Sequence, residues 1–281
     1  MKRLKTLFIA VALATAPLNS TPLIIRTGTI LKTFQVLGWV NFTYNQTVKS
    51  YNWDTNEFIK PEGFEPTTTA GADLLASVGL PGKLELGGVL PVIMMKSKGE
   101  ASSSGIGDLL LVARYGVLQN PLLPVRMALS VGLSLPTGNK NANPALGDGS
   151  TDLGAALAIN TVKLGFIIGH LRGAYWLNGK TDDTTRLGNM LQYMAGLDFP
   201  ILPKLTPQIA FTGYNQEAKL VNGTPLPNSE IDRGFLGILL LWQPIPNLTL
   251  RPKASFPILP VCKGGALADY NLGLDAWITL P

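Results

Sequence analysis

Apolar and polar side chains alternate with a period of two at the C-terminal end of the chain. The apolar set and the polar set interleave there: Tyr270, Leu272, Leu274, Ala276, Ile278 and Leu280 against Asp269, Asn271, Gly273, Asp275, Trp277 and Thr279. In an extended strand the two sets point to opposite faces of a sheet. The pattern therefore predicts a strand with one continuous apolar face, which lies either against a soluble core or against lipid.

The same kind of segment recurs along the chain about twelve times. Each segment is roughly ten to thirteen residues long, which is close to the length that a tilted strand needs to cross a bilayer. The predicted strands are 28–44, 66–79, 83–95, 107–118, 125–136, 151–161, 163–175, 187–199, 204–216, 232–243, 247–258 and 267–280. Periodicity does not assign the inward and outward faces of 164–176 and 235–242, because the first alternates poorly and the second is apolar on both faces.

The connections between these segments are alternately short and long. The long ones are rich in Gly, Asn, Ser, Lys and Asp: 45–65, 96–106, 137–150, 176–186, 217–231 and 259–266. Short turns at one end and long loops at the other are typical of a membrane barrel, whereas a soluble sandwich has shorter strands, commonly about five to six residues. The sequence predicts an all-β fold, a transmembrane antiparallel up-and-down β-barrel of about 12 strands.

Composition agrees with a membrane barrel. Only 15% of the 281 residues are charged, against roughly 25% in soluble domains. The mean hydropathy is +0.23, yet no run of about 18 apolar residues occurs beyond the N-terminal region. A chain this apolar without a candidate membrane helix is either a buried-sheet protein or a membrane barrel.

The first twenty residues have the order of a secretory signal peptide. Lys2, Arg3 and Lys5 precede the apolar run Leu7 to Ala14, which is too short to cross a bilayer comfortably. We expect residues 1–20 to be removed and residues 21–281 to form the barrel. Ala14-Thr15-Ala16 fits the cleavage rule, but Pro17 after it should hinder cleavage there, which leaves cleavage nearer Thr15 or Ser20 as the alternatives. Loss of the three basic residues lowers the net charge from +5 to +2, and no basic cluster interleaved with aromatics predicts a nucleic-acid partner.

The inward faces of the predicted strands carry charges of both signs. The candidate lumen residues are Asp108, Arg114, Arg126, Asp152, Arg172, Asp198, Arg251, Lys253, Asp269 and Asp275. We expect Asp108 and Asp152 to lie close enough to Arg114 or Arg126 to pair, either as a stabilising network or as a selectivity filter. A mixed lumen does not favour acidic sugars, and small neutral or weakly polar solutes fit it better.

Catalytic and metal sites lack support in the sequence. His170 is the single histidine, no Gly-x-Ser-x-Gly motif occurs, and His170 beside Arg172 fits a lumen residue better than a catalytic base. With one His and one Cys (Cys262), the usual zinc ligand sets cannot form. Asp148 and Asp152 lack calcium-loop spacing. We therefore expect no enzyme, no metal and no cofactor.

Four short motifs follow one another in a characteristic order. They are Leu84-Glu85-Leu86-Gly87, Gly105-Ile106-Gly107-Asp108-Leu109 with Arg114-Tyr115 after it, Leu135-Pro136-Thr137-Gly138, and Gly147-Asp148-Gly149-Ser150-Thr151-Asp152. Over roughly residues 66–281 this order resembles the outer-membrane family named for a meta-pathway of phenol degradation. The resemblance implies an outer-membrane barrel that admits hydrophobic or aromatic compounds.

The sequence thus predicts an exported protein of the outer membrane of a Gram-negative cell. Its expected partners are outer-membrane lipid, a small-molecule solute and the barrel-assembly machinery. The expected function is passive uptake of small solutes, hydrophobic or aromatic ones among them. The alternative is a non-transporting structural or adhesive barrel whose extracellular loops bind partners.

Overall fold

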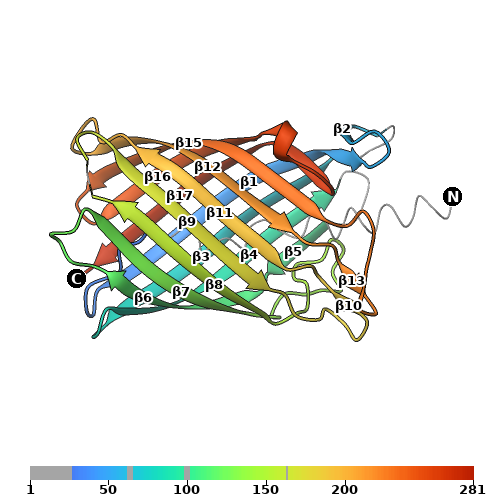
Figure 1. Cartoon of the computed structure of the whole chain (residues 1–281), viewed down its shortest axis with the longest axis horizontal. Coiled ribbons are helices and arrows are strands. Elements are labelled where there is room, and N and C mark those ends of the chain that lie inside the picture. Colours follow the sequence, from blue (N-terminus) through green and yellow to red (C-terminus); the bar gives the residue numbers. More distant parts are fainter. Residues whose placement is uncertain (1–26, 62–65, 98–101, 163) are drawn as a thin grey trace.

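The chain forms a closed antiparallel β-barrel in the computed structural model (Figure 1). The structure describes residues 27–61, 66–97, 102–162 and 164–281, so the predicted signal peptide, residues 1–20, lies outside the described residues. Within this part of the chain, twelve long strands make the wall: β1 Val36–Asn52, β3 Thr67–Leu80, β4 Leu84–Ser97, β6 Leu109–Leu118, β7 Val125–Leu135, β8 Asp152–Thr161, β9 Ile168–Leu177, β11 Met190–Asp198, β12 Leu205–Gln216, β15 Ile231–Ile245, β16 Leu248–Pro257 and β17 Ala266–Leu280. The predicted fold class is confirmed.

Neighbouring strands in the sequence are neighbours in the wall, and β1 pairs with β17 to close it. The C-terminus lies at the end of the barrel that carries the short turns, and the longer loops gather at the other end (Figure 1). Short elements extend the loop end: β2 Glu57–Ile59, β5 Ser102–Ile106, β10 Thr185–Arg186, β13 Leu220–Val221, β14 Thr224–Pro225 and the 3-10 turn η1 Leu259–Val261. By the usual orientation of such barrels, the short turns are periplasmic and the long loops extracellular.

The outer face of the wall is apolar along every long strand. In β4, for example, Leu84 and Leu86 are exposed outward, while Glu85 between them is 2% exposed and points inward. Exposure of such large apolar side chains to water is unfavourable. Contact with the hydrocarbon core of a bilayer suits them. None of the described helical turns is long and apolar enough to cross a membrane.

The structure assigns the two segments whose faces were ambiguous. On β9, His170, Arg172, Ala174 and Trp176 point inward, since Leu171, Tyr175 and Leu177 are exposed outward. On β15, Phe235 is buried and points inward, whereas Leu236, Ile238 and Trp242 are exposed.

The first predicted strand, 28–44, was wrong in its N-terminal half. The strand begins at Val36. Phe34 has a positive φ of 65° and its N–H donates to the carbonyl of Gly79, so the extended chain is interrupted just before β1. Residues 27–35, hereafter the lumen segment, turn into the periplasmic end of the barrel instead of continuing the wall.

Candidate functional site: the barrel lumen

Inward-facing apolar side chains form a buried cluster inside the barrel. One contact cluster joins inward-facing residues from β1 round to β12, and Trp277 and Leu31 pack against it: Leu37, Trp39, Leu75, Val89, Leu110, Ala156, Ala174, Trp176, Met194 and Ala210. Trp39 and Trp277 are cross-strand partners, and Trp176 lies on β9, six strands from β1 in either direction round the wall. The interior of the barrel therefore contains buried indole rings and a methionine as well as charged side chains.

A charged network covers the wall formed by β16, β17, β1 and β3. The carboxylate of Asp275 is fully buried and binds Arg251 at 2.7 Å and Lys253 at 3.0 Å. Lys253 also donates to the side-chain oxygen of Asn41, whose amide donates in turn to Asp73. Each acid in this network faces a donor side chain. The wall therefore presents paired charges to the lumen and little net charge.

A second pair of charges lies at the periplasmic half, between β4 and β6. Arg114 Nη1 donates to Glu85 Oε2 at 3.0 Å, and both side chains are almost completely buried. Sequence reasoning missed Glu85 as a lumen residue, although its position between Leu84 and Leu86 on a period-two strand signals that it points inward.

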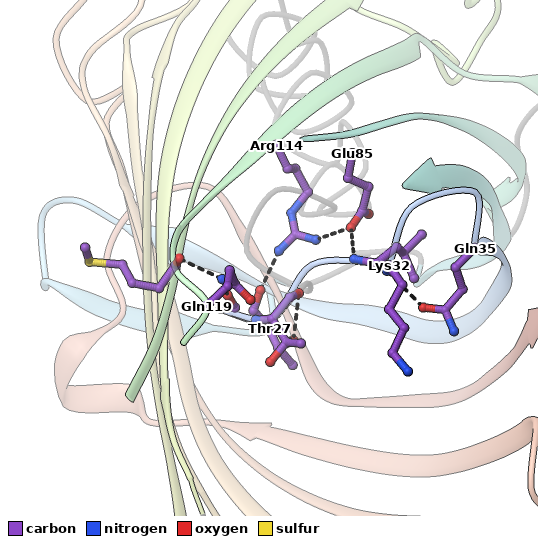
Figure 2. A network of polar contacts seen from close by, with 10 residues as sticks. Thr27, Lys32, Gln35, Glu85, Arg114 and Gln119 are labelled. Atoms are coloured by element: carbon purple, nitrogen blue, oxygen red, sulfur yellow. Dashed lines mark hydrogen bonds and ion pairs between the residues drawn. The ribbon is translucent and has the colours of Figure 1, made fainter. Parts of the chain in front are cut away.

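The Glu85–Arg114 pair holds the lumen segment inside the barrel (Figure 2). Arg114 also donates to the carbonyl of Thr27, and Glu85 Oε2 accepts the backbone N–H of Leu31 at 3.1 Å. Gln119, close to the β6–β7 turn, donates to the carbonyl of Gly28 at 2.7 Å. The lumen segment is thus clamped against the inner wall at the periplasmic end, and it narrows the route there.

At the extracellular half, loop residues 136–151 fold against the inner wall; we call this segment the docked loop. Asp108 lies in a bulge, where one extra residue separates the β5 and β6 pairings with β4. Its carboxylate accepts the backbone N–H groups of Gly138 and Asp148. Leu146 of the docked loop packs on Ile93 and Met95 of β4.

Three of the motifs that carry the family resemblance therefore meet at one place. Gly107-Asp108, Thr137-Gly138 and Gly147-Asp148 are joined by the two bonds to Asp108 and by the Thr137 hydroxyl, which donates to the carbonyl of Gly107 at 2.8 Å. Gly147 has to be glycine for this packing, since a Cβ there would lie 2.5 Å from Asp108 Oδ1. The motifs anchor the docked loop to the barrel wall.

The expected pairing of Asp108 and Asp152 with Arg114 or Arg126 was wrong. Asp108 binds the docked loop, and Asp152 accepts from the Ser150 hydroxyl and the backbone N–H of Gly179. Arg114 pairs with Glu85, and Arg126 donates to the carbonyls of Asn120 and Leu123 at the periplasmic turn. The two acids lie at the loop end of the barrel. The two arginines lie nearer the turn end, too far along the strands to pair with the acids.

The other candidate lumen residues fall into separate contacts. Arg251, Lys253 and Asp275 form the charged network described above. Asp198 is buried and binds His170 at 2.7 Å, whereas Arg172 is buried on β9 with Met194 Sδ at 3.4 Å. Asp269 lies at the outer end of β17, where it pairs with Lys49 and stays half exposed. Within the described residues, no group of three or more His, Cys, Asp and Glu side chains is placed to hold a metal ion.

We expect docking of the loop to depend on pH through Asp148. Burial, followed by the neighbouring Asp152, raises the pKa of Asp148 from 3.8 to about 6. A raised acid pKa favours the protonated form in the docked state. The docked state is therefore most stable below about pH 4 and loses about 3 kcal/mol as pH rises through about 6. Amide hydrogen exchange of residues 136–151, corrected for intrinsic rates, should show stronger protection at pH 5 than at pH 7.5.

The matched variants for this experiment are Asp148→Asn and Asp182→Asn. An amide oxygen at position 148 can still accept the two Ser150 bonds, so the first variant should keep the loop docked and flatten the pH profile. Asp182 lies fully exposed in another loop, and its replacement should leave the wild-type profile. Equal pH dependence in all three proteins would contradict the role of Asp148.

Comparison with known proteins agrees with this geometry. The model of one protein family, described as Putative MetA-pathway of phenol degradation, matches residues 31–257. An outer membrane channel from Pseudomonas putida F1 has a similar structure, with a TM-score of 0.79 and 15% sequence identity over 94% of this chain and 100% of that one. This likeness shows a shared fold.

Two further solved structures are less similar. NanC porin has a TM-score of 0.48 and 10% identity over 86% of this chain and 98% of its own. The beta domain of the Bordetella autotransporter BrkA also has a TM-score of 0.48, with 11% identity over 88% of this chain and 100% of its own. Comparison with curated protein sequences gave no match.

A closed barrel with an apolar outer face, built like an outer-membrane channel, lies in the outer membrane. The family model covers most of the chain, including all four motifs that suggested the resemblance. The chain belongs to the family described as Putative MetA-pathway of phenol degradation.

Proposed function

We propose that the protein is a non-enzymatic channel that passes small neutral solutes, hydrophobic or aromatic ones among them, across the outer membrane. The observation that carries this proposal is the apolar cluster inside the barrel, which includes Trp39 and Trp176 and against which Trp277 packs. Indole rings and methionine give an aromatic solute dispersion and stacking contacts that water does not give.

The arrangement of charge supports a neutral solute. The buried acids Glu85, Asp198 and Asp275 each bind a donor side chain. Paired charges discriminate weakly between anions and cations, whereas rings of one sign select strongly. We propose that Arg172, Arg251, Lys253, Asp198 and Asp275 line the route, and that Asp108 and Asp152 position the docked loop beside it.

We also propose that residues 1–20 are a signal peptide that is removed after export. The expected partners are outer-membrane lipid, the barrel-assembly machinery and the solute itself, with no nucleic acid. The apolar outer face supports the lipid contact, and the resemblance in fold to an outer membrane channel supports membrane assembly.

Planar-bilayer recording of the refolded barrel tests the channel proposal. We expect small, discrete conductance steps with weak ion selectivity, because the lumen segment and the docked loop narrow a lumen of paired charges. Liposome swelling should admit small neutral solutes and slow steeply as solute size rises. A bilayer that stays silent under conditions where a known narrow porin conducts would contradict passage and favour the non-transporting alternative.

A further inference from the structure

The short turns at the periplasmic end of the barrel carry exposed apolar side chains. Leu122 in the β6–β7 turn is 89% exposed, Phe166 in the β8–β9 turn 65%, Ile201 in the β11–β12 turn 63% and Ile245 at the end of β15 56%. These four turns follow one another round the wall. Apolar side chains gathered at one end of a protein indicate a surface that contacts another molecule.

The exposed turn side chains lie beyond aromatic residues of the kind that mark a membrane boundary. Trp242 is exposed on the outer face of β15, and Ile245 lies three residues farther toward the periplasm on the same strand. Tyr115 is exposed outward on β6, and the chain runs from there to Leu122 in the turn. Because Trp and Tyr are enriched at the level of the lipid headgroups, the turn tips reach the headgroups of the periplasmic leaflet.

Exposed charge at this end of the barrel has one sign. Lys32 in the lumen segment, Lys83 in the β3–β4 turn and Lys204 in the β11–β12 turn are exposed. The acidic side chains near this end of the described chain are Glu85 and Asp198, and each is buried with a partner side chain. Within the described residues, the periplasmic rim therefore presents ammonium groups and no exposed Asp or Glu side chain.

Lys204 lies against one group of exposed apolar side chains. Its Nζ donates to the carbonyl of Pro244 at 3.2 Å, and its own carbonyl accepts the backbone N–H of Gln243. Ile245 follows Pro244 directly, and Ile201 precedes Lys204 by three residues in the same turn. One bond to a carbonyl leaves two of the three ammonium hydrogens for a ligand. We call Lys204, Ile201 and Ile245 the Lys204 site.

Lys83 lies beside the β6–β7 turn in a similar way. Its carbonyl accepts the backbone N–H of Gly116 near the end of β6. Arg126 donates to two carbonyls of the β6–β7 turn, and Leu122 between them is exposed. Among the ion pairs of the described residues, none involves Lys83 or Lys204. We call Lys83 and Leu122 the Lys83 site.

We propose that the Lys83 site and the Lys204 site each bind an anionic phospholipid of the periplasmic leaflet. The ammonium group binds the phosphate of the headgroup, and the apolar turn side chains contact the glycerol and the first carbons of the acyl chains. A zwitterionic phospholipid binds less tightly, since its own cationic group offsets the charge of the phosphate. The two sites hold the periplasmic rim at the level of the headgroups.

Fluorescence quenching in reconstituted vesicles tests the two sites. A nitrobenzoxadiazole dye is attached to Ile201→Cys or to Leu122→Cys, each with Cys262→Ser, so that the apolar dye takes the place of a turn side chain. The quencher is phosphatidylglycerol or phosphatidylcholine with a spin label high on the acyl chain. We expect about fivefold stronger association of phosphatidylglycerol at both positions, the gain that one lysine near an anionic lipid surface gives. Equal quenching by the two lipids would overturn the proposal.

A dye at the other end of the barrel is the control for position. Asn222→Cys, again with Cys262→Ser, lies in the exposed extracellular turn between β13 and β14 and should show neither quenching nor lipid preference. The same preference there as at the periplasmic turns would contradict the two sites. Absence of quenching at positions 201 and 122 would also overturn them, because the turns would then face a soluble periplasmic partner instead of lipid.

Charge variants test each site separately. Lys204→Gln should abolish the preference at position 201 and leave it at position 122, because charge is lost on one side of the rim only. Lys83→Gln should do the reverse, so each variant is the matched control of the other. Both lysines are exposed, so neither change removes a packed side chain. If either variant lowers the preference equally at both dye positions, the rim acts through its total charge and the two local sites are wrong.

Salt separates the ionic contact from the apolar contact. Raising NaCl from about 0.1 M to about 1 M screens the attraction between ammonium and phosphate. The preference for phosphatidylglycerol should then be lost while quenching by phosphatidylcholine persists, and a preference that survives high salt would contradict the role of the lysines. None of these measurements requires conductance. Their failure leaves the proposed channel function intact, and a silent barrel leaves the lipid sites intact.

Discussion

Replacing Glu85 with alanine should both destabilise the barrel and release the lumen segment. The change leaves Arg114 as a buried charge without its carboxylate, which costs about 3–5 kcal/mol in the free energy of unfolding. It also removes the acceptor of the Leu31 N–H. We expect a severalfold larger single-channel conductance, measured in planar bilayers, and a lower urea midpoint followed by tryptophan fluorescence.

Two further variants separate stability from occlusion. In the double variant Glu85→Met/Arg114→Met, apolar side chains of similar length replace the pair, so most of the lost stability should return while the clamp stays absent. Gly28→Ala acts on the lumen segment alone, because a Cβ there would lie 2.4 Å from the carbonyl oxygen of Arg126. Both should conduct like Glu85→Ala. Wild-type conductance in both would show that residues 27–35 do not limit the route.

The wall of this barrel is predictable because its signal is local. The predicted strand 204–216 corresponds to β12, Leu205–Gln216, and 267–280 corresponds to β17, Ala266–Leu280. Each strand has to turn apolar side chains to lipid along its whole length, so the period of two persists from end to end. The inward direction of Asp275 or Arg251 follows from the same alternation.

The contacts inside the lumen depend on register and on distant parts of the chain, which alternation does not encode. Residues 28–35 have a composition that suits a strand, and long-range bonds such as those of Gly28 to Gln119, Leu31 to Glu85 and Phe34 to Gly79 place them inside the barrel. Likewise Arg114 points inward as predicted, but strand pairing gives it Glu85 as a partner rather than Asp108.

The contacts of the docked loop also depend on distant parts of the chain, so the local sequence does not predict them. Its glycines signal a special backbone, and the family motifs signal a shared site, yet nothing local indicates that Gly138 and Asp148 donate to Asp108 thirty and forty residues earlier. The position of Asp108 in a bulge depends on the pairing of β4 with two successive strands. Long-range pairing of this kind has to be observed.

Asp275→Ala should produce the largest change in ion selectivity and a large loss of stability. Asp275 is the shared acceptor of Arg251 and Lys253, and it is fully buried. Its removal leaves two adjacent cations without their carboxylate, at a cost of about 3–5 kcal/mol in the free energy of unfolding. The reversal potential in a salt gradient should shift toward anions, because the two basic groups then act as an unpaired positive patch on the lumen wall.

Asp269→Ala is the matched control on the same strand. Asp269 pairs with Lys49 at 2.6 Å, but its side chain is 47% exposed, and an exposed pair contributes only about 0–1 kcal/mol. This variant should unfold and conduct nearly as wild type does. If the two variants shift the reversal potential equally, selectivity depends on the total charge of the barrel. If only Asp275→Ala does, selectivity depends on the buried network of β16, β17, β1 and β3, and the ions pass along that wall.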